Sequence, residues 1–119
     1  MSDEFIEIAT KEINEELSGL EELLFACQND ANVFSNAGKF QKHTHKIKGL
    51  APMMGKEELG SFSTILDSLL KKMIDGTTIN GILNDMTDSI SLMKQSMSEP
   101  DSNLTEIKNR ISQILNNLK

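Results

Sequence analysis

The chain has no tryptophan and no tyrosine, only two prolines, and a single cysteine, Cys27, in 119 residues. One cysteine cannot form an intramolecular disulfide, so the fold has to hold together without one, and we expect a reducing, cytoplasmic setting. Because the large aromatics are missing, the core must be built from Leu, Ile, Met and a few Phe side chains, which suits a helical bundle.

Long apolar runs and concentrated positive charge are also absent. No segment is apolar for long enough to be the hydrophobic region of a signal peptide or a transmembrane helix. The chain carries 12 Lys and Arg against 18 Asp and Glu, a net charge of −6, and its lysines are scattered. Nucleic acids and anionic membranes require a basic patch, so we expect neither as a partner.

Apolar residues recur every three or four positions along most of the chain, the spacing of one face of an α-helix. We find no strand-like alternation, repeat or low-complexity linker, and the length suits a single domain over residues 1–119. The pattern predicts an all-α fold, an antiparallel up-down four-helix bundle with an additional C-terminal fifth helix. The predicted helices cover residues 3–27, 35–51, 56–74, 78–98 and 103–118, with a loop at 28–32 and helix-ending signals at Pro52, Gly76 and Pro100.

The helix predicted over residues 35–51 places His45 on an unusual face. At about 100° per residue, the predicted buried face consists of Phe40, His43, Ile47, Leu50, Ala51 and Met54. His45 lies on the opposite side, in a strip of polar and small residues formed by Gly38, Gln41, Lys42, Lys48, Gly49 and Pro52. We therefore expect His45 to be reachable from solvent.

Two residues close to His45 on the predicted helix, Gly49 and Lys48, indicate that its imidazole reacts with another molecule. Gly49 lies one turn later, inside the predicted helix, where glycine costs about 1 kcal/mol relative to alanine. A purely structural helix has no reason to accept that cost, so we interpret the missing side chain as space for a bulky reactant. Lys48 can bring an ammonium group within reach of negative charge on the imidazole. Together the three residues suggest a docking surface for phosphate.

A second polar strip is expected on the helix predicted over residues 56–74. Its members are Gly60, Ser63, Thr64, Asp67 and Lys71. Asp67 is the acid that we pair with His45. A carboxylate that accepts a hydrogen bond from one imidazole nitrogen fixes the tautomer and leaves the other nitrogen free as a nucleophile. The candidate catalytic residues are thus His45, Lys48 and Asp67.

The run from His45 to Gly49, His-Lys-Ile-Lys-Gly, followed by Gly55, resembles the H-x-[LI]-K-G…G signature of histidine-containing phosphotransfer domains. The resemblance is closest to the N-terminal phosphotransfer domains of chemotaxis histidine kinases of the CheA type. It extends over nearly the whole chain, from the first acidic helix to the fifth helix after Pro100.

The resemblance implies a role in two-component phosphorelay signalling. An ATP-binding kinase catalytic domain would phosphorylate the ε nitrogen of His45, and the phosphohistidine would pass the group to an aspartate of a response-regulator receiver domain. Lys48 would offset the phosphoryl charge, and Asp67 stands where the family usually has a glutamate that holds the δ nitrogen. The residues expected to dock the kinase or the receiver are Gln41, Gly49, Pro52, Gly60, Ser63 and Thr64.

The sequence also departs from the CheA pattern. Asp67 is one methylene shorter than the usual glutamate. Leu50 and Pro52 stand where that pattern is often rich in glycine, and Thr44 replaces a common alanine. We expect these residues to make the surface around His45 bulkier, which would narrow the range of response regulators that fit.

No G-x-G-x-x-G motif, P-loop or ATP-lid segment occurs, so we expect a phosphoryl carrier without a cofactor. It is either an independent relay protein or the phosphoacceptor domain of a larger kinase. The alternative is a helical interaction module that is never phosphorylated and uses the same strip for docking. His43 falls on the apolar face and is expected to be a partly buried core residue. It points about 160° away from His45, so one metal ion cannot bind both.

Overall fold

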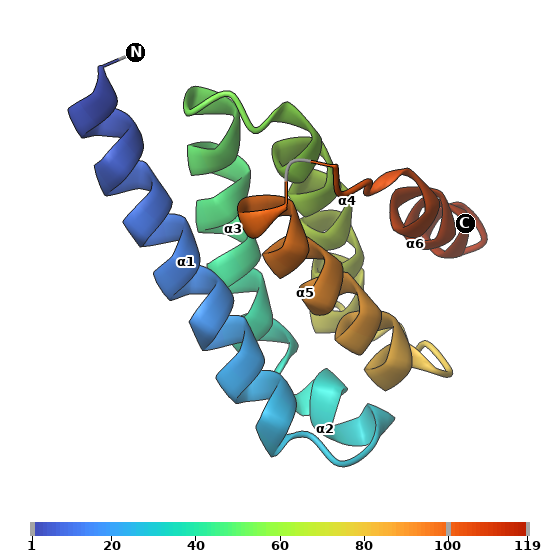
Figure 1. The fold of residues 1–119 in the computed structure, drawn as a ribbon. Coiled ribbons are helices and arrows are strands. Elements are labelled where there is room, and N and C mark those ends of the chain that lie inside the picture. Colours follow the sequence, from blue (N-terminus) through green and yellow to red (C-terminus); the bar gives the residue numbers. More distant parts are fainter. Residues whose placement is uncertain (1, 100, 119) are drawn as a thin grey trace.

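The structure, a computed structural model, describes residues 2–99 and 101–118, which form six α-helices and no strand. Helices α1, α3, α4 and α5 lie side by side, the short α2 joins α1 to α3, and α6 packs against α4 and α5 (Figure 1). The prediction of an all-α fold with bundle packing is confirmed for the described residues. The helices are α1 (Asp3–Ala26), α2 (Asp30–Ser35), α3 (Ala37–Met53), α4 (Glu57–Ile74), α5 (Ile82–Ser98) and α6 (Thr105–Asn116).

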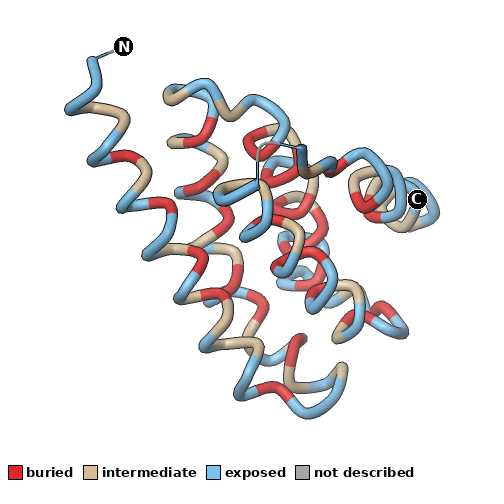
Figure 2. The backbone as a smooth tube through the Cα atoms, in the orientation of Figure 1, coloured by how far each residue is buried: buried red, intermediate tan, exposed pale blue. Residues whose placement is uncertain are grey.

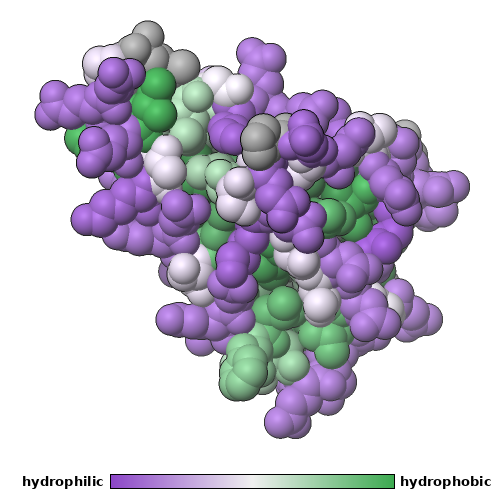
Figure 3. All heavy atoms as spheres, in the orientation of Figure 1, coloured by the Kyte–Doolittle hydropathy of each residue, from purple (hydrophilic) through white to green (hydrophobic). Residues whose placement is uncertain are grey.

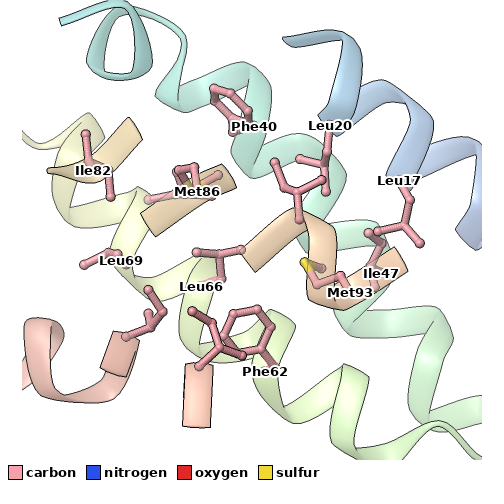
Figure 4. Packing of buried hydrophobic residues seen from close by; sticks show 14 of the residues in the cluster. Leu17, Leu20, Phe40, Ile47, Phe62, Leu66, Leu69, Ile82, Met86 and Met93 are labelled. Carbon is pink, nitrogen blue, oxygen red and sulfur yellow. The ribbon is translucent and has the colours of Figure 1, made fainter. Parts of the chain in front are cut away.

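The buried residues fall mainly on the sides of the helices that face one another, as the red segments of the backbone tube show (Figure 2). They are mainly Leu, Ile, Met and Phe, as the composition indicated, and their removal from water is the main stabilising contribution to the fold. Helices α1, α3, α4 and α5 all contribute side chains to this hydrophobic core (Figure 4). Among them are Leu17, Leu20, Phe40, Ile47, Phe62, Leu66, Leu69, Ile82, Met86 and Met93.

The loop predicted over residues 28–32 is wrong in part, because α2 begins at Asp30. The side chain of Asn29 caps this helix by accepting a hydrogen bond from the backbone N–H of Asn32, over 2.9 Å. The Asp30 carboxylate in turn accepts the backbone N–H groups of Gly81 and Leu83, over 2.8 and 2.9 Å. These two bonds hold α2 against the start of α5.

Helix α5 begins at Ile82 rather than near residue 78. The residue before it, Gly81, has a φ of 83°, in the left-handed region that glycine adopts without strain. The predicted start was early because the apolar spacing continues through Ile79, which is buried although it precedes the helix. Pro100, predicted to close the region after α5, lies outside the described residues.

Helix α3 passes through Pro52 and ends at Met53, slightly beyond the predicted end. Its C-terminus is closed by two backbone hydrogen bonds, from Gly55 N–H to the Pro52 carbonyl (3.1 Å) and from Lys56 N–H to the Ala51 carbonyl (2.9 Å). Gly55 has a φ of 85°, as this type of helix ending requires. Gly55, ten residues after His45, therefore terminates α3.

Candidate functional site

His45 lies on the solvent side of α3, as its helical position predicted. Its imidazole is exposed and makes no hydrogen bond or ion pair within residues 2–99 and 101–118. Of the face expected to be buried, Phe40, Ile47 and Ala51 are completely buried, whereas His43, Leu50 and Met54 are only partly so. The orientation of α3 therefore leaves both ring nitrogens of His45 available.

Gly49 is exposed, and a Cβ added to it would meet no atom within 4 Å. Packing within the described residues thus gives no reason for glycine at this position. Gly38, two turns before His45 on the same side of α3, is equally unconstrained. The space that the sequence indicated beside His45 is open in the structure.

Asp67 is almost completely buried between α4 and α3, with 2% of its side chain exposed. Its Oδ1 accepts a hydrogen bond from Gln41 Nε2 over 2.8 Å and lies 3.2 Å from the Thr44 hydroxyl. Its Oδ2 lies 3.5 Å from Lys48 Nζ and 3.3 Å from Lys71 Nζ. Both oxygens of the carboxylate are therefore engaged by other side chains.

The expected hydrogen bond between His45 and Asp67 is consequently absent from the described part of the chain. Thr44, about 100° before His45 around the helix, faces α4 and takes the position beside the carboxylate. Thr44 is completely buried, so the expectation that it enlarges the surface around His45 is also wrong. Asp67 ties α3 to α4 and positions Lys48.

The pKa of Asp67 is lower than its ordinary value. Burial alone would raise it, but the hydrogen bonds from Gln41 and Lys71 and the positive charges of Lys48 and Lys71 outweigh that effect. Asp67 is thus ionised at neutral pH, and it holds two ammonium groups, one of them from Lys48, three residues after His45 on α3.

Two residues of the strip expected on α4 are not on the surface. Gly60 is buried against Pro52, and a Cβ at position 60 would lie 2.5 Å from the Pro52 Cγ. Ser63 is completely buried, and its hydroxyl has no partner within the described residues. The expected docking role of Gly60 and Ser63 is therefore wrong, because both residues lie in the packing between helices. Of the other expected docking residues, Thr64 and Pro52 are exposed and Gln41 is half-buried.

The sequence places Lys71 on the polar strip of α4, but it predicts no function for this residue. The signal that could have singled it out is its spacing of four residues after Asp67, which brings oppositely charged side chains together on a helix. It is the more exposed of the two lysines, with 56% of its side chain accessible against 32% for Lys48.

His43 is half-buried between α3 and α1, as predicted. Its Nδ1 lies 2.7 Å from Glu16 Oε1, and its ring packs against Gly19, where an added Cβ would come within 2.4 Å of the imidazole Cε1. The histidine–carboxylate pair of this protein therefore involves His43. The ring therefore packs on α1, and 28% of the His43 side chain is exposed.

A groove of about 1080 Å³ runs between α1 and α5, where hydrophobic side chains gather among hydrophilic ones (Figure 3). Its apolar lining includes Leu17, Leu24, Leu83, Ile90 and Met97, and none of its lining residues comes from α3 or α4. His45 thus lies on an open helix face outside this groove. Such a face suits another protein better than a small molecule, which binds in concave sites.

The described residues contain no group of three His, Cys, Asp or Glu side chains placed to hold a metal ion. Among the same residues, none of the helices is both long and apolar enough to cross a bilayer. No protein-family model, curated protein or solved structure matches the chain. What the site does has to follow from its own residues.

Proposed function

We propose that this chain is a histidine phosphotransfer module, an up-down four-helix bundle with α6 as the additional C-terminal helix, in which His45 carries the phosphoryl group. The observation that supports this most directly is the exposed, unengaged imidazole of His45 with open space at Gly49 one turn away. Lys48, three residues after His45, provides positive charge on the same side of α3.

In the proposed reaction, the lone pair of one imidazole nitrogen forms a bond to phosphorus. The bond between phosphorus and the leaving group of the donor breaks, and its electron pair goes to that group. The proton on the second nitrogen of His45 is released to water, which leaves the phosphorylated ring neutral, because both oxygens of Asp67 are engaged by other side chains. In the second transfer, an oxygen of an acceptor carboxylate forms a bond to phosphorus, the N–P bond breaks, and its electron pair returns to the imidazole nitrogen. Catalysis of both steps depends on positioning and on neutralisation of charge.

The partners in this proposal are an ATP-binding kinase catalytic domain as donor and a response-regulator receiver domain as acceptor, in a cytoplasmic two-component pathway such as chemotaxis. Mg²⁺ belongs to the sites of those partners. The exposed face of α3 around His45 supports this view because both partners must reach the ring in turn. The chain serves either as an independent relay or as the acceptor domain of a larger kinase.

A helical interaction module that is never phosphorylated remains the second candidate. The observation that favours it is the absence of an orienting hydrogen bond to His45 within the described residues. A module of this kind would use the exposed Pro52 and Met53 as docking contacts without chemistry at the histidine.

One labelling experiment separates the two candidates. The protein is incubated with phosphoramidate, a small donor that needs no protein recognition, and with histidine-kinase catalytic domains and labelled ATP. We expect an acid-labile, base-stable phosphohistidine in the wild type and in His43→Gln, and none in His45→Gln. Unchanged labelling of His45→Gln, or none of the wild type with either donor, would contradict the proposal and favour the second candidate.

A further inference from the structure

Two lysines share one oxygen of a buried carboxylate. Lys48 from α3 and Lys71 from α4 both approach Asp67 Oδ2, with Nζ–Oδ2 distances of 3.5 and 3.3 Å. The other oxygen, Oδ1, is held by Gln41 and Thr44. One lysine would provide a counter-ion for Asp67, so the presence of a second one needs an explanation.

Phosphorylation of His45 would create a competing demand for Lys48. The phosphoryl group adds negative charge within one helical turn of the Lys48 side chain, which can turn toward it. If Lys48 were the only cation beside Asp67, its departure would leave a buried carboxylate without a positive partner, which is strongly unfavourable. Lys71 can stay on Oδ2 when Lys48 leaves.

We propose that Lys71 is a positioning residue for phosphotransfer, because it keeps the charge of Asp67 compensated and so releases Lys48 to the phosphoryl group on His45. This inference rests on the proposed function. In the unphosphorylated protein the two lysines and Asp67 together carry a net charge of +1. The incoming phosphoryl group therefore meets a positive site, although the whole chain is acidic.

The test compares Lys71→Met with Lys72→Met. Both replacements remove one charge and keep a long unbranched side chain. Lys72 is the exposed neighbour and makes no ion pair within the described residues. We expect Lys71→Met to slow phosphorylation of His45 by phosphoramidate about tenfold, the effect of weakening one coupled ion pair. Lys72→Met should match the wild type, and Lys71→Arg should retain most of the wild-type rate.

A double variant distinguishes positioning from a merely structural role. With methionine at position 71, Lys48 is held by Asp67, so Asp67→Asn should release it and restore part of the rate in the Lys71→Met background. If each substitution merely damaged the structure, the two losses of phosphorylation rate would instead add in the double variant. Circular dichroism establishes that each variant is folded.

Equal rates for Lys71→Met and Lys72→Met would overturn the role of Lys71, as would additive losses in the double variant. His45-dependent labelling of the wild type would still stand in both cases. The proposed function fails only if the wild type is not labelled, or if its label does not depend on His45, and the inference then fails with it.

Discussion

The imidazole of His43 occupies the space that a side chain at Gly19 would need, since a Cβ at position 19 would lie 2.4 Å from Cε1 of the ring. Glycine in the middle of α1 weakens the helix, and this contact between α1 and α3 explains its presence. A shift of the ring away from Gly19 would strain its 2.7 Å hydrogen bond with Glu16.

Gly19→Ala should therefore destabilise the protein by about 1–3 kcal/mol, the usual effect of overpacking, although alanine is the better helix former. Gly38→Ala is the matched control, because its Cβ meets nothing, and it should stabilise α3 by up to about 1 kcal/mol. Urea denaturation followed by circular dichroism measures both. If the two variants were stabilised alike, the packing of His43 on Gly19 would have no energetic importance.

Gly49→Gln should raise stability but slow phosphorylation of His45. Glutamine is a better helix former than glycine by about 0.5–1 kcal/mol, and no described atom opposes a side chain at position 49. The long side chain would occupy the space one turn from the imidazole. Gly38→Gln provides the comparison, because it adds the same side chain in the first turn of α3; its gain in stability should be smaller and the labelling rate unchanged. Equal labelling rates for the two variants would remove the functional reason for glycine at position 49.

Asp67→Ala should lower the free energy of unfolding at pH 7 by about 1–3 kcal/mol, because the Gln41 amide loses its charged acceptor, whereas the Thr44 hydroxyl keeps the Gln41 carbonyl 3.1 Å away. The lowered pKa of Asp67 means that its contribution is present above the unfolded-state pKa and is lost as the pH falls through the folded-state value. The difference between wild type and variant should therefore narrow below about pH 4. A difference that stays constant from neutral pH to about pH 2 would show that the charge of Asp67 contributes nothing to stability.

Ser63→Ala should stabilise the protein, because the buried Ser63 hydroxyl has no partner in the described residues and alanine removes the cost of burying it. We expect a gain of about 1 kcal/mol, part of which reflects helix propensity. Ser68→Ala on the same helix separates the cost of burying an unpaired hydroxyl from the gain in helix propensity, since the Ser68 hydroxyl donates to the Thr64 carbonyl at an exposed position. Thermal unfolding of both variants is the measurement, and a smaller gain for Ser63→Ala than for Ser68→Ala would indicate that the Ser63 hydroxyl is satisfied.

The sequence by itself determined the long helices and the exposed side of α3. Apolar spacing and helix-ending glycines are local properties, set by residues within a turn or two. They located α1 and α4 closely and put His45 on the solvent side of α3, opposite the buried Ile47. The same local signals missed α2, a helix of six residues held by a side-chain cap and by Asp30 bonds to the distant Gly81.

Only the tertiary structure decided how the side chains of the candidate site pair. Helical periodicity placed Asp67 on a polar strip of α4 and suggested His45 as its partner, but it could not say which α3 residue the carboxylate would meet. That choice depends on how α3 and α4 are rotated and offset against each other. In the structure Thr44, Gln41 and Lys48 reach Asp67 while His45 remains in solvent, and Lys71 becomes a second counter-ion.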